Sequence, residues 1–548
     1  MKKHFDFNIT YCVDGQSYTV DRLKCDHFEL VITEKEEVMK VVLYPKCEIS
    51  NINISMSCTH LYTPESKIFV NGYQSWTESR EFAIDEKLQR SGILGKLIPN
   101  ISAYGDERFV KRPPRGVFHG YTYGYIRDYT KTHLYGSMTE INGYTIIQFN
   151  TKHNAVIISK DLEGVKISKP YEVFNIGYFE GEYDEVFDRY FSLQNLPGLR
   201  LKSATGYTSW YNYYKKVTRK NIDNDLLSFQ MQGVQPMIFQ IDDGYQKHVG
   251  DWLDVKKAFG DMKELTDSIH DAGIKAGLWL APFACFSNSK LYKEHKDWLL
   301  RDEKGRLVKG GFSWYPISTY YVLDFLNPGV QKYLKDVFFH ILNVWNFDMV
   351  KLDFLYAECL VPRQNKSRGQ IMCEAMDFLR ECVGNKLILG CGVPLGAAFG
   401  RVDFCRIGCD VTLKWEEGFI GRIVCSELPS TIRTLNNTIF RRHLNGRAFV
   451  NDPDVFFLRD YNIKLTEEQR LIIADVNKLF GGVLFVSDDV ARYSERSLDN
   501  LKSVFKDDEI EILEAEYMTK SIISIRYTIN GIEQELVFDI QQGKVIRG

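Results

Sequence analysis

The sequence predicts an α/β protein: a (β/α)₈ TIM barrel flanked by a large N-terminal β-sandwich and a C-terminal antiparallel β domain. Three observations lead to this prediction. Short strand-like runs fill residues 1 to about 200, strand-like and helical runs then alternate from about Ala204, and strands return after about Val490. A chain of 548 residues is long enough for two or three domains. We expect the three domains at 1–200, 201–490 and 491–548.

The N-terminal region contains short runs rich in β-branched and aromatic residues, separated by turn residues. The clearest of these runs are 29–33, 38–43, 67–70, 145–149 and 155–159. A helical period first becomes clear at 183–191, so the pattern favours a large β-sandwich. A polar, aromatic stretch from Asn71 to Trp76 directly follows one of the strands, and taken alone it indicates a loop with a packing tryptophan.

Eight strand-like runs alternate with helical stretches in the central region. The predicted strands are 205–211, 236–242, 274–281, 349–355, 387–392, 402–408, 449–455 and 482–488. Among the helices, 466–480 begins at Thr466 with Glu467 behind it and ends before two glycines, as helix start and stop signals require. A doubly wound open sheet is the alternative. Strands at 510–517, 521–527 and 533–540 then form the C-terminal domain.

Composition and charge exclude several classes of partner. The apolar fraction of 44% and charged fraction of 26% are ordinary for a globular protein, and a net charge of −3 provides no basic footprint for nucleic acid or a membrane surface. No apolar run approaches the length of a membrane span, and the start of the chain lacks the apolar segment of a signal peptide. We expect a small-molecule substrate; the oligomeric state is not predicted.

The twelve cysteines are scattered, with no C-x-x-C pair and no Cys/His cluster at zinc spacing. This usage indicates a reduced, cytoplasmic protein. We expect no metal and no cofactor.

Lys351 and Asp353 lie two positions apart at the end of the fourth predicted barrel strand, and therefore share one face of it. A carboxylate paired with a lysine stays ionised at neutral pH and can attack an electrophilic carbon. The alternative is a buried ion pair that closes the strand.

Other polar residues also fall at the carboxyl ends of predicted strands, where barrels of this class place their active sites. They are Asp242, Asp243, Trp279, Cys391, Arg406, Asp410 and the stretch 451–454. A set of carboxylates with one lysine, one arginine and tryptophans favours the binding of a neutral polyol. Some of these charged groups then remain available for acid and base chemistry.

Glycosidic cleavage needs two carboxylates in different environments. Asp353 would be the ionised nucleophile. Asp410 would have to be protonated at rest; its apolar neighbours raise a carboxyl pKa, whereas Arg406 lowers it, and the sequence does not decide the balance. Asp242 and Asp243 would bind sugar hydroxyls.

Six strings occur in the order and register of one enzyme family. They are Gly206-Tyr-Thr-Ser-Trp-Tyr211, Gln240-Ile-Asp-Asp-Gly-Tyr-Gln246, Gly277-Leu-Trp-Leu-Ala-Pro282, Lys351-Leu-Asp-Phe354, Arg406-Ile-Gly-Cys-Asp410 and Asn451-Asp-Pro-Asp454. Together they resemble the α-galactosidases of glycoside hydrolase family 36 (melibiase clan), in their compact form of roughly 550 residues. The resemblance covers the barrel closely and the flanking domains in outline, and it implies an N-terminal β-supersandwich and a C-terminal β-sandwich.

This resemblance implies a retaining hydrolase that cleaves terminal non-reducing α-D-galactose by double displacement, with Asp353 matching the nucleophile and Asp410 the acid/base. The positions that match sugar-binding residues are Trp76, Trp210, Asp242, Asp243, Trp279, Lys351, Cys391 and Arg406. It also implies that the loop around Trp76 brings an aromatic ring into the pocket.

Two departures from the family pattern leave alternatives open. Cys409 stands where a proline often precedes the acid/base residue, and the region from Gly390 to Leu395 lacks a Gly-rich, Ser-containing run, so recognition at the sugar C2 position is open. An α-N-acetylgalactosaminidase or an α-galactosyl transferase with the same fold and mechanism is therefore the nearest alternative. A non-catalytic carbohydrate-binding protein is a further one, and the two intact carboxylates argue against it.

Overall fold

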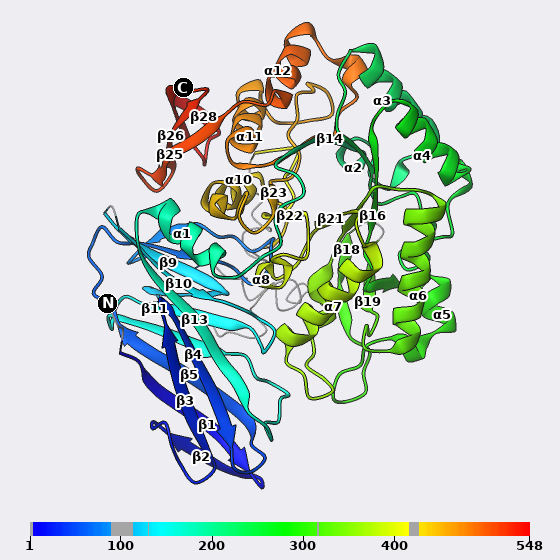
Figure 1. Ribbon diagram of the computed structural model, residues 1–548. Helices are drawn as coiled ribbons and strands as arrows, with labels where there is room; N and C mark the ends of the chain where they lie inside the picture. The colour runs from blue at the N-terminus through cyan, green and yellow to red at the C-terminus, as the bar shows by residue number, and fades with distance from the viewer. Residues whose placement is uncertain (1–3, 89–112, 130, 315–316, 416–426, 548) are drawn as a thin grey trace.

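The computed structural model describes residues 4–88, 113–129, 131–314, 317–415 and 427–547. The basic start of the chain, Met1 to Lys3, lies outside the described residues. Figure 1 shows three parts: paired β-sheets in blue and cyan, a ring of strands and helices in green to orange, and a small sheet in red. This is the predicted order of a β-sandwich, a barrel and a C-terminal antiparallel domain.

Two antiparallel sheets form the N-terminal part. The first sheet runs β2 (Gln16–Val20), β1 (Asp6–Val13), β5 (Ser50–Thr59), β12 (Ala155–Lys160), β11 (Thr145–Asn150) and β8 (Val117–Tyr121). The second sheet runs β3 (Phe28–Lys35), β4 (Val38–Pro45), β13 (Tyr171–Gly181), β10 (Lys131–Ser137), β9 (Tyr123–Asp128), β6 (Lys67–Val70) and β7 (Glu81–Ala83). Side chains from both sheets, such as Ile54 and Val41, pack into one apolar core. Alternating burial along the strands explains why the sequence predicts them: β1 buries every second residue.

All eight predicted barrel strands are present and parallel. In sheet order they are β23 (Val450–Asp452), β22 (Phe404–Arg406), β21 (Leu387–Gly390), β20 (Met349–Leu352), β16 (Lys275–Leu280), β15 (Ile238–Ile241), β14 (Ala204–Thr208) and β24 (Val483–Val486). The ring closes between β23 and β24, where the Gly482 N–H donates to the Asn451 carbonyl and the Phe456 N–H donates to the Phe485 carbonyl. Gly206 on β14 permits the close packing of β14 against its neighbour β24, because a Cβ there would lie 2.3 Å from the Phe485 ring.

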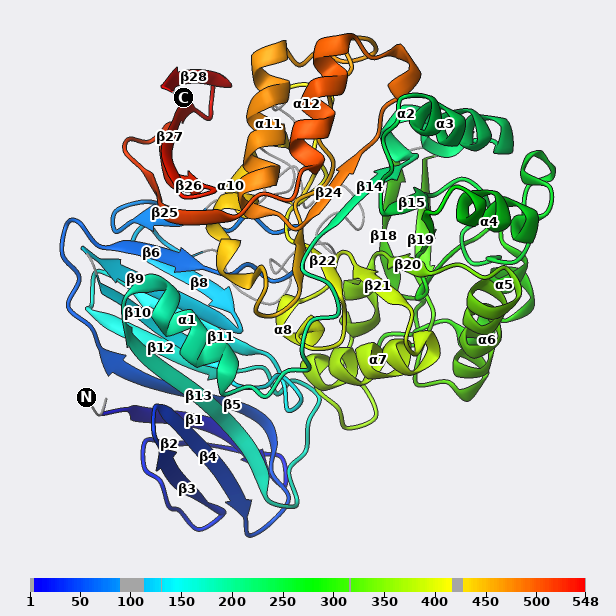
Figure 2. The ribbon, with the colours of Figure 1, turned by 45° about the horizontal axis from the view of Figure 1, so that its top comes forward.

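Helices cover the outside of the barrel (Figures 1 and 2). They are α3 (Arg219–Met231), α4 (Met262–Asp271), α6 (Pro328–Phe339), α7 (Arg368–Val383), α10 (Thr431–Phe440), α11 (Glu467–Phe480) and α12 (Glu495–Phe505). Two short helices, α2 (Trp210–Tyr213) and α8 (Leu395–Ala398), follow the carboxyl ends of β14 and β21. Helix α11 begins at the predicted residue because Thr466 and Gln469 form a capping box. In the sandwich, α1 (Tyr183–Ser192) is also present as predicted.

One feature was not predicted from the sequence. Between β16 and α6 the chain forms α5 (Lys290–Glu294) and a small sheet of β17 (Ala284–Phe286), β19 (Ile317–Val322) and β18 (Lys309–Trp314). Residues from β17 contribute to the wall of the cavity described below.

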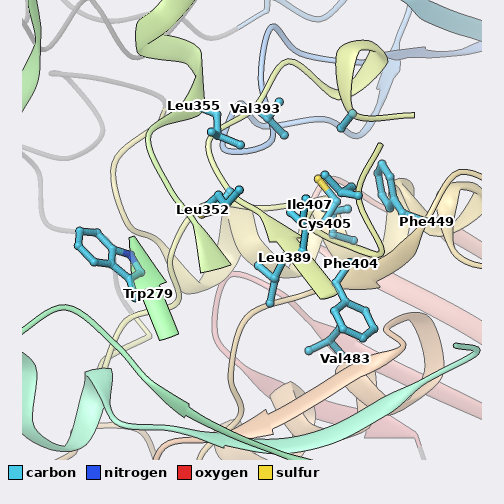
Figure 3. Packing of buried hydrophobic residues seen from close by; sticks show 14 of the residues in the cluster. Trp279, Leu352, Leu355, Leu389, Val393, Phe404, Cys405, Ile407, Phe449 and Val483 are labelled. Atoms are coloured by element: carbon cyan, nitrogen blue, oxygen red, sulfur yellow. The ribbon is translucent and has the colours of Figure 1, made fainter. Parts of the chain in front are cut away.

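A large apolar core is built around the barrel strands, and Figure 3 shows labelled members of this core that come from strands β16, β20, β21, β22 and β24. The same core is continuous with Tyr73 and Trp76 of the N-terminal part and with Phe538 of the C-terminal sheet. The three parts are therefore packed against one another through shared apolar contacts.

The C-terminal part is one antiparallel sheet of β25 (Ile510–Tyr517), β26 (Ile522–Ile529), β27 (Ile532–Asp539) and β28 (Lys544–Arg547). The family resemblance implies a β-sandwich here, but the described residues form a single layer. Barrel elements take the place of the second layer: Tyr517 stacks on Phe440 of α10, and Trp415 donates from its indole N–H to the carbonyl of Ile540. No helix in the described ranges is long and apolar enough to cross a membrane.

Candidate active site

A cavity of about 780 Å³ opens at the carboxyl ends of the barrel strands. Six of the ten predicted site residues line it: Trp76, Trp210, Asp243, Trp279, Asp353 and Asp410. The other four are buried residues of the same strand ends, namely Asp242, Lys351, Cys391 and Arg406. The structure therefore brings the ten predicted residues together at one end of the barrel.

Asp353 follows directly after β20, whose four residues are all buried. Trp279 Nε1 donates to Asp353 Oδ2 at 3.0 Å, and the Phe354 N–H donates to Asp353 Oδ1 at 2.8 Å. The second bond requires a sharp bend, and Phe354 has a positive φ of 54°. A bulky residue rarely adopts this conformation, and such residues concentrate at functional sites.

The direct partner of Lys351 differs from the predicted one. Lys351 Nζ binds Asp242 Oδ2 at 2.9 Å, whereas the sequence predicts a pair with Asp353. Burial opposes the charge on Lys351, but Asp242 together with Cys391 and Asp353 outweighs this effect, so the lysine pKa lies above its ordinary value. Lys351 thus stabilises the buried Asp242, and Asp353 is held by Trp279 and the backbone.

Asp242 and Asp243 follow β15 and are fixed by separate groups. Gln240 Nε2 donates to Asp242 Oδ2 at 2.8 Å, and Gln246 Nε2 donates to Asp243 Oδ1 at 2.7 Å. Lys215 Nζ lies 3.4 Å from Asp243 Oδ2. Burial raises the pKa of Asp243, and Lys215 opposes the shift. The sequence analysis did not identify Lys215, which lies outside the predicted strands.

Asp410 lies on the loop after β22 and keeps 42% of its side chain exposed. Arg406 Nη1 donates to Asp410 Oδ1 at 2.9 Å. The pKa of Asp410 is nevertheless raised: desolvation by the surrounding protein raises it most, the carboxylates of Asp353 and Asp242 add to this, and Arg406 and Lys351 oppose it.

The charge of Arg406 is shared among three carboxylates. Besides Asp410, its Nε binds Asp452 Oδ2 at 2.8 Å and its Nη2 binds Asp454 Oδ1 at 2.9 Å. The sequence left open whether Arg406 or the apolar surroundings dominate the pKa of Asp410. Because Arg406 also binds two other carboxylates, it lowers the pKa of Asp410 less than an unshared cation would. The sequence analysis named the stretch 451–454 without a role for it.

Trp76 reaches the cavity from the N-terminal part. Its Nε1 donates to Cys391 Sγ at 3.4 Å, and its ring meets the ring of Phe354 edge-on at 5.5 Å between centroids. Gly392 leaves room for the indole, because a Cβ there would lie 2.8 Å from Trp76 Cζ2. The predicted aromatic loop is therefore part of the cavity wall.

Arg441, at the end of α10, fixes this loop to the barrel and is fully buried. Its guanidinium donates to Asn71 Oδ1 and to the carbonyl oxygens of Gln74, Ser75 and Ile407, at distances between 2.6 and 3.2 Å. Burial lowers the pKa of Arg441 to about 10. Sequence reasoning missed this residue, since its partners are carbonyl groups far away in the chain.

The arrangement can perform two-carboxylate chemistry on a neutral, hydroxyl-rich molecule. Asp353 and Asp410 face one cavity, and their hydrogen-bonding partners differ. Aromatic rings and fixed carboxylates are the groups that bind the faces and hydroxyls of a sugar. Within the described ranges, no group of three or more His, Cys, Asp or Glu side chains is arranged to hold a metal ion.

A family model described as Melibiase matches residues 209–372, which begin at the end of β14 and reach into α7. The "A type blood alpha-D-galactosamine galactosaminidase" of Flavonifractor plautii is 32% identical over 173 residues, or 28% of this chain. The "Alpha-galactosidase Mel36A" of Lactobacillus acidophilus is 31% identical over 124 residues, or 21% of this chain. The chain spans 16% of the length of each of these two relatives.

Solved structures are similar over nearly the whole chain. TtGalA, an alpha-galactosidase from Thermus thermophilus in complex with p-nitrophenyl alpha-D-galactopyranoside, has a TM-score of 0.74 at 22% identity and covers 98% of this chain and 100% of its own. The GH36 alpha-galactosidase AgaA from Geobacillus stearothermophilus has a TM-score of 0.59 at 12% identity, covering 95% of this chain and 73% of its own. At these identities the likeness establishes the fold.

Proposed function

We propose that the protein is a retaining α-galactosidase; the support is that residues 209–372, within the barrel, match the Melibiase model. It would remove terminal non-reducing α-D-galactose from α-galactosides. The observation that carries this proposal is the pair of carboxylates in one cavity, Asp353 and Asp410, whose environments suit opposite roles.

In the first step, Asp353 attacks the anomeric carbon from the face opposite the leaving oxygen. The C1–O bond to the aglycone breaks while Asp410 gives its proton to that oxygen. The products of this step are a β-linked galactosyl ester of Asp353 and the free alcohol. The bonds from Trp279 and the Phe354 N–H hold the attacking carboxylate in place.

In the second step, Asp410 is a carboxylate and acts as a base. It takes a proton from water, the water oxygen attacks the anomeric carbon, and the ester bond to Asp353 breaks. Two inversions give net retention, so the first product is α-galactose. Asp410 is again protonated, and the cycle is complete.

Sugar binding is assigned to the remaining predicted residues. Asp243 lines the cavity and is available to accept a hydrogen bond from a hydroxyl group, while Trp76, Trp210 and Trp279 supply apolar surface for the ring faces. The buried layer of Asp242, Lys351, Cys391 and Arg406 supports the cavity and contacts the sugar where it penetrates most deeply. No cofactor takes part in this scheme.

A panel of chromogenic substrates tests the proposal. We expect turnover of nitrophenyl α-D-galactoside, and none with Asp353→Asn, which keeps the shape of the side chain but cannot form the ester. Nitrophenyl α-N-acetylgalactosaminide is the comparison at C2, and preferential cleavage of it would replace the proposed substrate. Absence of turnover on every α-glycoside would leave a binding protein, and the proposal would fail.

We also propose a reducing, cytoplasmic location. The support is cysteine usage: each of the eleven cysteines in the described ranges is a free thiol. A finding that the protein accumulates outside the cytoplasm, by fractionation of its source cells, would contradict this.

A further inference from the structure

A second acidic pair, Asp452 and Asp454, lies beside Asp410, and the proposed reaction does not use it. Asp452 ends β23, and both side chains are buried, Asp454 to 1% exposure. Asp454 has a positive φ of 74°. A residue other than glycine seldom adopts this conformation unless the surrounding structure enforces it, and such residues concentrate at functional sites.

The carboxylate of Asp454 binds groups on both sides of Asp410. Arg406 Nη2 lies 2.9 Å from Asp454 Oδ1, and the Val411 N–H donates to Asp454 Oδ2 at 2.9 Å. Arg406 also binds Asp410 directly, and Val411 is the next residue in the chain. Tyr211 donates its hydroxyl to Asp454 Oδ2 at 2.5 Å and so fixes the carboxylate itself.

The charges around Asp410 come from several strands. The groups that act on it or respond to it are Lys351 on β20, Asp353 after β20, Asp242 after β15, Arg406 at the end of β22, Asp454 after β23, and the side chains of Tyr211, Tyr214, Cys391 and Cys409. The two cations are shared with other carboxylates: Lys351 binds Asp242, and Arg406 binds Asp452 and Asp454 in addition to Asp410. The carboxylates around Asp410 therefore outnumber the cations, and no cation is reserved for Asp410 alone.

We infer that Asp454 is a positioning residue for the proton donor: it holds Arg406 and the Val411 backbone so that Asp410 meets the leaving oxygen as a neutral acid. Asp454 is not among the cavity-lining residues, so it acts through these neighbours. The inference rests on the proposed function, because only a general acid needs this control. Burial raises the pKa of Asp454 most, Asp410 and Asp452 add to this shift, and Arg406 and Tyr211 oppose it; the ion pair with Arg406 favours the charged form of Asp454.

Asp454→Asn tests the inference. Without the charge of Asp454, Arg406 acts more strongly on Asp410, and the repulsion between the two carboxylates is lost. Both changes favour ionised Asp410, so the alkaline limb of kcat/KM on alkyl α-galactosides should move to lower pH by roughly one to two units. Nitrophenyl galactosides do not need the acid, and their kcat/KM should stay within about threefold.

Asp488→Asn is the matched control. Asp488 is also a buried carboxylate at a barrel strand end, but its arginine partner is Arg459, at 3.4 Å. Removing it should lower stability without moving the alkaline limb. A limb that stays in place in Asp454→Asn, or moves equally in both variants, would overturn the inference.

A readout without turnover separates this inference from the proposed function. The infrared band of the protonated Asp410 carboxyl, assigned by its loss in Asp410→Asn, should titrate at lower pH in Asp454→Asn than in the wild type. If the wild type cleaves no α-galactoside, the proposed function fails, and this titration alone decides whether Asp454 controls Asp410. An unshifted band would reject that control.

Discussion

Gly392→Ala tests whether the N-terminal part completes the cavity. Gly392 has a φ of +60°, and an added Cβ would lie 2.8 Å from Trp76 Cζ2 and 3.1 Å from Cη2. An ordinary contact needs at least 3.4 Å, so the indole must move by about 0.6 Å (3.4 − 2.8). The hydrogen bond from Trp76 Nε1 to Cys391 Sγ restricts this movement. Misplacing a site group by about 1 Å can cost ~10²-fold in rate, so we expect kcat/KM on nitrophenyl α-galactoside to fall by about 10- to 100-fold.

Gly233→Ala provides the control, because Gly233 has nearly the same φ, +62°, and no atom within 4 Å of its added Cβ. Both variants should lose about 1–2 kcal/mol of stability from the backbone conformation. Gly392→Ala should lose a further ~1–3 kcal/mol from overpacking. Denaturant unfolding and steady-state kinetics measure the two effects. Equal loss of stability in both variants, with kcat/KM of Gly392→Ala within about twofold of the wild type, would refute the placement of Trp76.

Three further predictions concern the carboxylates. Asp410→Ala should cleave alkyl galactosides ~10²–10⁴-fold more slowly but keep the glycosylation step with nitrophenyl leaving groups. Because the side chain faces the cavity, azide should enter the vacated space and give α-galactosyl azide. Asp353→Ala should instead give the β anomer, as NMR of the products will show. Lys351→Met leaves Asp242 buried without its ion pair and should lower the free energy of unfolding, measured with denaturant, by about 3–5 kcal/mol. The double variant Lys351→Met/Asp242→Asn should recover part of this loss, and additive losses from the two substitutions would contradict the pairing. Since Asp410 must be protonated to act and its pKa is raised, kcat/KM on alkyl galactosides should be highest below that pKa and fall as pH rises through it. A kcat/KM that increases with pH in this range would reject Asp410 as the acid.

The strands of the barrel could be predicted because each is a short apolar run with a polar residue at its carboxyl end. This local pattern also identified Asp353, Trp279 and Asp243, since a strand end fixes the direction of the residue that follows it. The sandwich strands were predictable for a similar reason, because burial alternates along them.

Partners across the barrel could not be predicted in the same way. Lys351 binds Asp242, which follows β15, because its long side chain reaches past the intervening strand β16; alternation along one strand pointed instead to Asp353. The three carboxylates on Arg406 depend on the spacing of β22 and β23 in the closed ring. Trp76 and Cys391 are 315 positions apart, and their contact results from the packing of two domains.

The central claim is that Asp353 forms a covalent bond to the sugar while Asp410 transfers the proton. The most direct test is to incubate the enzyme with a slow-reacting fluorinated galactosyl fluoride and to locate the label by mass spectrometry of its peptides. The account predicts one fluorogalactosyl group per chain, on the peptide that contains Asp353, and no label on Asp353→Asn. A label on Asp410, or turnover that inverts the anomeric centre without any labelled peptide, would contradict it.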